Sequence, residues 1–196
     1  MTAGGRSPGE KRLEPLPKYL RPGLHMVFIG YNPGIESARA GHYYAHPGNV
    51  FWKQLYESGL TDRPVSHRDD SLLASAGSIG FVDLCPRPSA RASDLSRTEV
   101  VRGARRLRRE IEAACPRFAV FSGRGIYRLF GIHALGLSGR DLAGRRDGLQ
   151  PERIGEAIPY VIPSSSGLAS RWHRQRLQRL RELRQLLDGS GHAGSA

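Results

Sequence analysis

Short apolar runs separated by helix-like segments constrain the fold of this chain most strongly. Segments with the length and composition of buried strands occupy residues 25–29, 79–84, 117–121 and 159–162. Segments with helical spacing or a helix-starting residue occupy residues 49–58, 71–76, 98–114, 124–130 and 171–187. Strands that alternate with helices form a parallel sheet that is covered on both faces. We therefore predict an α/β fold, a three-layer α/β/α sandwich with a short, mainly parallel central sheet.

The length of the chain, 196 residues, suits one domain with a real core, which we place at residues 18–187. Residues 1–17 carry charges and prolines but no apolar signal core, so we expect a disordered leader there and a flexible tail at residues 188–196. The Gly- and Arg-rich segment 131–156 is predicted to be a loop or hairpin. No apolar run approaches membrane-spanning length, so we expect no membrane partner and a soluble, cytoplasmic monomer, nucleoid-associated in a bacterium.

The charge balance favours a polyanionic partner. The formal net charge is +12, and 27 of the 30 basic residues are arginines. Composition alone does not separate DNA from RNA or from an acidic membrane surface. We expect the arginine-rich segments 102–109 and 171–184 to be solvated sides of helices, some of which also follow phosphates.

Several familiar cofactor and metal motifs are absent from the sequence. Cys85 and Cys115 are too few for a disulfide framework or an iron–sulfur cluster, and we expect two reduced, buried thiols. The histidines lack the spacing of zinc ligands, residues 123–128 lack the third glycine of a dinucleotide fingerprint, and no Walker loop occurs. We therefore predict a catalyst that uses neither a metal nor a nucleotide cofactor.

Three polar loops follow predicted strands, at residues 30–34, 83–88 and 163–171. Because parallel sheets bind ligands at the carboxyl ends of their strands, these loops are the candidate site. The first loop, Gly30-Tyr-Asn-Pro-Gly34, offers an amide that can orient a water molecule but is not a useful base. This pentapeptide by itself fits an ordinary turn after a strand better.

Longer segments change that balance. The first loop continues into Gly41-His-Tyr-Tyr-Ala-His-Pro-Gly-Asn-Val-Phe-Trp-Lys53. Further segments are Gly80-Phe-Val-Asp-Leu-Cys-Pro-Arg-Pro88 with Asp94-Leu-Ser96, Phe118-Ala-Val-Phe-Ser-Gly-Arg-Gly-Ile-Tyr127 and Pro163-Ser-Ser-Ser-Gly167. In order and spacing, across about residues 22–187, they resemble the motif blocks of the uracil-DNA glycosylase superfamily, in its mismatch-specific uracil and thymine branch.

The resemblance implies an enzyme that flips a nucleotide out of duplex DNA and hydrolyses the N-glycosidic bond of uracil, or of thymine, opposite guanine, the first step of base excision repair. No lysine lies in the pocket motifs apart from Lys53, so we expect a monofunctional enzyme without Schiff-base strand cleavage. Two alternatives stay open. One is a superfamily member that acts on deaminated purines or other damaged bases, and the other is a non-catalytic binder of lesions or mismatches.

The resemblance also assigns roles in the pocket. Asn32 matches the residue that positions the attacking water, and the alternative is an asparagine that only stabilises its turn. Tyr44 matches the aromatic residue that stacks on the flipped pyrimidine, and the alternative is a half-buried core tyrosine. The backbone of Gly30 and Tyr31 is expected to approach the edge of the base.

Leu168 matches the wedge that fills the gap left by the flipped base, although it could also be a core leucine at the start of a helix. Gly167 and Arg171 are expected near the orphaned guanine or its strand. Hydrogen bonds to phosphates, or simple turn formation, are expected from three serines, Ser164, Ser165 and Ser166.

Asp83 departs from the family pattern, because close relatives carry asparagine or a basic residue there. A carboxylate near the reacting sugar can activate the water or stabilise the cationic sugar, so we expect Asp83 to be catalytic. The alternative is a structural aspartate paired with Arg87.

Overall fold

The computed structural model describes residues 13–166 and 171–189. In these residues one sheet has the order β2-β1-β3-β5-β4. The strands are β1 (Met26–Gly30), β2 (Ile79–Asp83), β3 (Phe118–Phe121), β4 (Gly148–Leu149) and β5 (Ile158–Val161). The α-helices are α1 (Ile35–Ala40), α2 (Phe51–Glu57), α3 (Asp70–Ser75), α4 (Arg97–Ala114), α5 (Arg124–Phe130) and α6 (His173–Asp188). Shorter helical turns are η1 (His67–Asp69), η2 (Ala92–Asp94) and the π-helical η3 (Gly131–Leu135).

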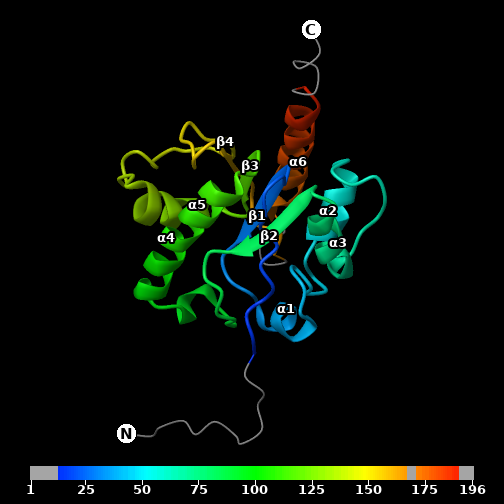
Figure 1. Ribbon diagram of the computed structural model, residues 1–196, viewed down its shortest axis with the longest axis horizontal. Helices are drawn as coiled ribbons and strands as arrows, with labels where there is room; N and C mark the ends of the chain where they lie inside the picture. Colours follow the sequence, from blue (N-terminus) through cyan, green and yellow to red (C-terminus); the bar gives the residue numbers. More distant parts are fainter. Residues whose placement is uncertain (1–12, 167–170, 190–196) are drawn as a thin grey trace, which may run out of the picture.

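The sheet is parallel except at one edge, where β4 runs antiparallel to β5. Helices α4 and α5 cover one face, and α2, α3 and α6 lie on the other (Figure 1). Successive strand residues alternate between the two cores, so Ile29 packs toward α4 and α5 while Phe28 packs toward α2 and α6. The predicted three-layer α/β/α sandwich with a mainly parallel sheet is confirmed.

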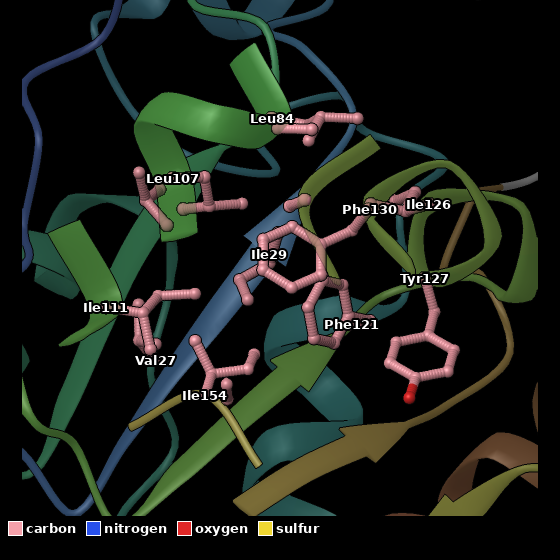
Figure 2. Packing of buried hydrophobic residues seen from close by; sticks show 14 of the residues in the cluster. Val27, Ile29, Leu84, Leu107, Ile111, Phe121, Ile126, Tyr127, Phe130 and Ile154 are labelled. Atoms are coloured by element: carbon pink, nitrogen blue, oxygen red, sulfur yellow. The ribbon is translucent and has the colours of Figure 1, made fainter. Parts of the chain in front are cut away.

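The core under α4 and α5 explains the helical spacing of α4. Leu107 and Ile111 are fully buried and point at Val27 and Ile29 of β1 (Figure 2). The helix begins at a capping box, in which the Ser96 hydroxyl accepts a hydrogen bond from the backbone N–H of Glu99 at 3.3 Å. These contacts fix α4 against the sheet on the side where β2 ends.

The core on the other face contains a residue that the sequence analysis placed in solvent. Arg176 is completely buried, because it follows the same side of α6 as Leu180 and Leu183. Its Nη1 donates to Gln54 Oε1 at 2.7 Å, and its guanidinium lies 5.2 Å from the centre of the Phe51 ring. The expectation that the arginine-rich segment 171–184 is a solvated side of a helix is therefore wrong at this position.

Other local expectations also need correction. Cys85 is buried as expected, but Cys115 is exposed, since it ends α4 with a left-handed φ of 48° just before a proline. Helix α1 was not predicted, and η3 extends the helical path beyond α5 into the predicted loop. Within the predicted leader, Leu16 packs against the core and the Pro17 carbonyl accepts a hydrogen bond from the Tyr43 hydroxyl at 3.0 Å.

None of the helices within residues 13–166 and 171–189 has the length and apolar character needed to cross a membrane.

Gly103 tests how closely α4 packs on the end of β2. An added Cβ would lie 2.1 Å from the backbone oxygen of Leu84. We expect Gly103→Ala to lower the free energy of unfolding by about 1–3 kcal/mol through overpacking, although alanine is the better helix former. Urea unfolding measures this. The control is Gly125→Ala on α5, where an added Cβ meets nothing within 4 Å, and we expect no loss there. Equal stability of the two variants would contradict the close packing.

Candidate active site

A cavity of about 760 Å³ opens at the carboxyl ends of the central strands. Its wall includes residues that directly follow β1, the last residue of β2 and Ser122 just after β3. The helices after β1 and β3 cover opposite faces of the sheet, so this is the switch point at which parallel sheets bind ligands. The volume lies within the range of roughly 300–1,000 Å³ that is typical of small-molecule sites.

Most of the residues predicted for the site line this one cavity. They are Gly30, Tyr31, Asn32, Tyr44, Asp83, Ser164, Ser165 and Ser166. Arg171 is exposed outside the cavity wall and stacks on Trp172, with its guanidinium 5.2 Å from the ring centre. Gly167 and Leu168 lie outside the described residues.

Asp83 places a carboxyl group in the wall of the cavity. The register between β1 and β2 pairs Asp83 with Gly30, and a Cβ on Gly30 would lie 2.2 Å from Asp83 Oδ1. Only glycine leaves this space, so Gly30 serves a close approach of side chain to backbone. Asp83 is only 7% exposed, and within the described residues no donor forms a hydrogen bond to its carboxyl oxygens.

The environment of Asp83 shifts its ionisation toward neutral pH. Burial raises the pKa of the carboxyl group to about 7, and the Arg106 guanidinium offsets only part of that effect. Arg106 donates from Nη2 to the backbone oxygen of Asp83 at 2.7 Å, so it supports the strand end rather than pairing with the carboxyl group. A buried, unpaired carboxyl group with a pKa near neutrality is a common mark of a functional site.

The structural alternative for Asp83, a pair with Arg87, is wrong. The Arg87 guanidinium binds both carboxyl oxygens of Glu99, at 2.5 and 3.1 Å. It also donates to the backbone oxygen of Asp94 at 2.7 Å. Arg87 is close to Asp83 in the sequence, but the turn after β2 directs its side chain to Glu99.

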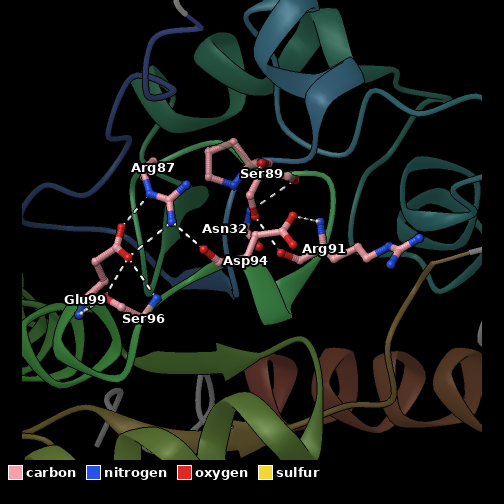
Figure 3. A network of polar contacts seen from close by, with 8 residues as sticks. Asn32, Arg87, Ser89, Arg91, Asp94, Ser96 and Glu99 are labelled. Atoms are coloured by element: carbon pink, nitrogen blue, oxygen red, sulfur yellow. Dashed lines mark hydrogen bonds and ion pairs between the residues drawn. The ribbon is translucent and has the colours of Figure 1, made fainter. Parts of the chain in front are cut away.

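The side-chain amide of Asn32 is held through its nitrogen atom (Figure 3). Its Nδ2 donates to the backbone oxygen of Pro33 at 2.9 Å and to Ser89 Oγ at 3.0 Å. The Ser89 hydroxyl donates its own hydrogen to the Arg91 carbonyl at 2.7 Å, so it faces Asn32 as an acceptor. With the amide nitrogen among oxygens, Asn32 Oδ1 has no protein donor in the described chain and remains free to accept a hydrogen bond.

Tyr44 supplies a flat surface to the cavity. Its ring is parallel to that of Phe51, with centroids 3.9 Å apart, and its hydroxyl lies 3.1 Å from Ser122 Oγ. The residue has a left-handed φ of 54°, an uncommon conformation for an aromatic side chain. Because Phe51 covers one face of the ring, the other face is the one available to a planar ligand.

The serine segment at the far wall is tied to neighbouring helices. The backbone oxygen of Ser165 accepts a hydrogen bond from the Val50 N–H at 3.3 Å, just before α2. The backbone oxygen of Ser166 lies 3.2 Å from His173 Nε2, at the start of α6. The backbone oxygens of Gly30 and Tyr31 are likewise engaged, with the N–H groups of Leu84 and Cys85 at 2.9 and 2.8 Å.

Three supporting residues escaped the sequence analysis: Ser89, Ser122 and Arg106. Ser122 lies in one of the motif blocks but received no role there, and each of the three acts through contacts between distant segments. For metals, no group of three or more His, Cys, Asp or Glu side chains gathers in the described ranges 13–166 and 171–189.

Comparison with known proteins supplies the remaining context. A model of the uracil DNA glycosylase superfamily matches residues 17–188. The fold is also similar to the solution NMR structure of a candidate uracil DNA glycosylase from Methanosarcina acetivorans, at 22% identity and a TM-score of 0.58. That match covers 91% of this chain and 99% of the other. At this identity the structural likeness shows the shared fold.

The shifted pKa of Asp83 predicts how stability depends on pH. The folded protein keeps the proton up to about pH 7, whereas the unfolded chain loses it near the ordinary aspartate pKa of 3.8. The stabilisation is therefore complete below the unfolded pKa and is lost as pH rises through about 7, by about 4 kcal/mol in total. Urea unfolding of the wild type and of Asp83→Asn between pH 4.5 and 8 measures the difference. Parallel curves for the two proteins would show that the pKa is not raised.

Proposed function

The chain belongs to the uracil DNA glycosylase superfamily, and we propose that it is a monofunctional enzyme that removes uracil, and thymine to a lesser extent, opposite guanine in duplex DNA. The observation that carries this proposal is that Asp83 and Asn32 line the same cavity. A fixed amide with a free oxygen can orient the attacking water, and an unpaired carboxyl group can accept its proton, so together they can carry out hydrolysis of a glycosidic bond.

The proposed division of labour follows from the chemistry of the two side chains. Asn32 Oδ1 accepts one hydrogen of a water molecule and aims its oxygen at the anomeric carbon. An amide does not take up a proton at neutral pH, so the proton of the attacking water passes to the Asp83 carboxylate. The bond between sugar and base breaks with its electron pair on the base, and the carboxylate opposes the positive charge that develops on the sugar.

Recognition of the base is assigned to the aromatic side of the cavity. The free face of Tyr44 stacks on the extruded pyrimidine, while the Phe51 ring supports it from behind. The backbone near Gly30 and Tyr31 approaches the edge of the base. The carbonyls of both residues already accept hydrogen bonds from residues 84 and 85, and the parallel ladder with β2 also engages the Gly30 N–H, so the Tyr31 N–H is the better candidate for this contact.

The DNA itself is proposed to cross the segment from Ser164 to Arg171. The serines in the cavity wall donate to phosphates, Leu168 fills the place of the extruded base, and Gly167 and Arg171 approach the orphaned guanine. We expect a cytoplasmic monomer that requires no cofactor and leaves an abasic site.

A panel of substrates tests the proposed function. Under single-turnover conditions, we expect release of free base from duplexes with G·U, slower release from G·T, and little from an undamaged duplex, because a matched base costs more to extrude. Adding A·U, single-stranded uracil and hypoxanthine substrates separates the alternatives. Preferred release of hypoxanthine would assign the enzyme to deaminated purines. Binding of mismatched DNA without release of any base would identify a non-catalytic lesion binder.

Substitutions in the pair test the mechanism. We expect Asp83→Asn to lower the single-turnover excision rate on G·U by roughly a hundredfold or more, the usual range for a positioned acid–base group. Affinity for DNA should change little, since a carboxylate makes no favourable contact with phosphate. Asn32→Ala should slow excision but leave residual activity through Asp83. Thermal melting controls for folding, and a folded Asp83→Asn protein that works at the parent rate would return Asp83 to a structural role.

A further inference from the structure

A second cavity, of about 360 Å³, lies beside the candidate active site. The first turn of α5 separates the two, because Ile126 lines the active-site cavity whereas its neighbours Gly125 and Tyr127 line the second one. Val161, the last residue of β5, also lines it, so this cavity opens at the same carboxyl edge of the sheet. Four arginines line its wall, namely Arg124, Arg128, Arg145 and Arg146, and we call it the arginine pocket.

Two of these arginines are fixed by carboxylates. Arg124 binds both carboxyl oxygens of Asp147, at 2.6 and 2.8 Å. Arg145 binds both carboxyl oxygens of Glu152, at 3.1 and 2.5 Å, and Glu152 accepts a further hydrogen bond from the Tyr127 hydroxyl. These pairs hold the walls of the pocket in place and neutralise two of its four positive charges.

The other two arginines keep their charge. Arg128 and Arg146 are exposed, and no carboxylate of the described chain forms an ion pair with either. They extend from different segments, Arg128 from α5 and Arg146 from the loop before β4. Their charges therefore face one concave wall with no internal counterion, which is the arrangement expected of a site for an anion.

The pocket is also connected to the start of α6, which follows the segment that we propose to meet DNA. Asp147, almost completely buried, accepts a hydrogen bond from Gln175 Nε2 on α6 at 2.9 Å in addition to Arg124. Helix α6 begins just after residues 163–171. Both cavities thus open at the same edge of the sheet.

We propose that the arginine pocket binds phosphodiester groups of the DNA backbone that flanks the extruded nucleotide. This inference rests on the proposed function, since it requires that DNA occupies the neighbouring cavity. Guanidinium groups match the geometry of phosphate oxygens, and the two paired arginines are already ordered before binding, which lowers its entropic cost. A free phosphorylated ligand shares this chemistry. Because the pocket is open and lies beside the active site, the continuous backbone of DNA is favoured over a free phosphorylated ligand.

Charge-removing substitutions test the pocket on undamaged duplex DNA, so the result does not depend on excision. For Arg128→Gln combined with Arg146→Gln, we expect weaker binding and a slope of log Kd against log salt that is smaller by about 1.8, or about 0.9 for each lost phosphate contact. Arg128→Lys with Arg146→Lys keeps the charges and should retain most of the slope. Thermal melting confirms that each variant is folded.

A matched pair elsewhere controls for net charge. Arg68 and Arg153 are exposed and line neither cavity, and Arg68→Gln with Arg153→Gln should leave the salt slope and excision unchanged. An equal drop in slope for this control pair, or an unchanged slope for the pocket pair, would overturn the proposal. Binding of inorganic phosphate or a free nucleotide in the pocket, with no effect of the substitutions on DNA binding, would also overturn it. If the wild-type protein binds DNA through the pocket but excises no base, only the proposed function would be overturned.

Discussion

The contact between the Asp83 carboxyl group and the backbone of Gly30 sets the geometry of the candidate site. It follows from the parallel register that places the last residues of β1 and β2 side by side. It requires glycine at position 30, because a Cβ would lie 2.2 Å from the carboxyl oxygen. Helix α4 maintains it from outside, since Gly103 packs on the backbone of Leu84 and Arg106 donates to the Asp83 carbonyl. The carboxyl group is thereby buried without a partner, which is the cause of its raised pKa.

The surrounding polar groups divide into those that are satisfied within the protein and those that are left open. Ser89 and the Pro33 carbonyl engage only the nitrogen of the Asn32 amide. Phe51 covers only one face of Tyr44. Asp83, Asn32 and Tyr44 thus each retain one unused surface, and all three line the same cavity. A buried polar group without a partner costs stability, so this arrangement is understandable where a substrate and a water molecule complete it. The proposed hydrolysis uses each of the open surfaces once.

The sequence predicted the layers of the fold because its strands are apolar on both faces and its longer helices have clear periodicity. It also predicted the loops that line the cavity, because these loops follow the strands. It did not predict Ser89, which lies in an unremarkable Pro-Ser-Ala stretch and meets Asn32 only through the fold. Arg176 was misplaced because arginines surround it, although its spacing of four from Leu180 already puts both on one side of a helix. Its contacts with Gln54 and Phe51 become visible only in the fold. Arg87 was offered to Asp83 on proximity in sequence, whereas the turn after β2 directs it to Glu99.

The central claim is that the Asp83 carboxylate accepts the proton of the attacking water. The measurement that tests it most directly is the pH dependence of single-turnover excision on a G·U duplex between pH 5 and 9. Because only the ionised carboxyl group can act as the base, the rate is predicted to rise with pH and to level off above an apparent pKa near 7. The same rise of the rate with pH should be absent from the slow reaction of Asp83→Asn. A wild-type rate that does not change over this range, or an identical rise of the rate with pH in the variant, would contradict the claim.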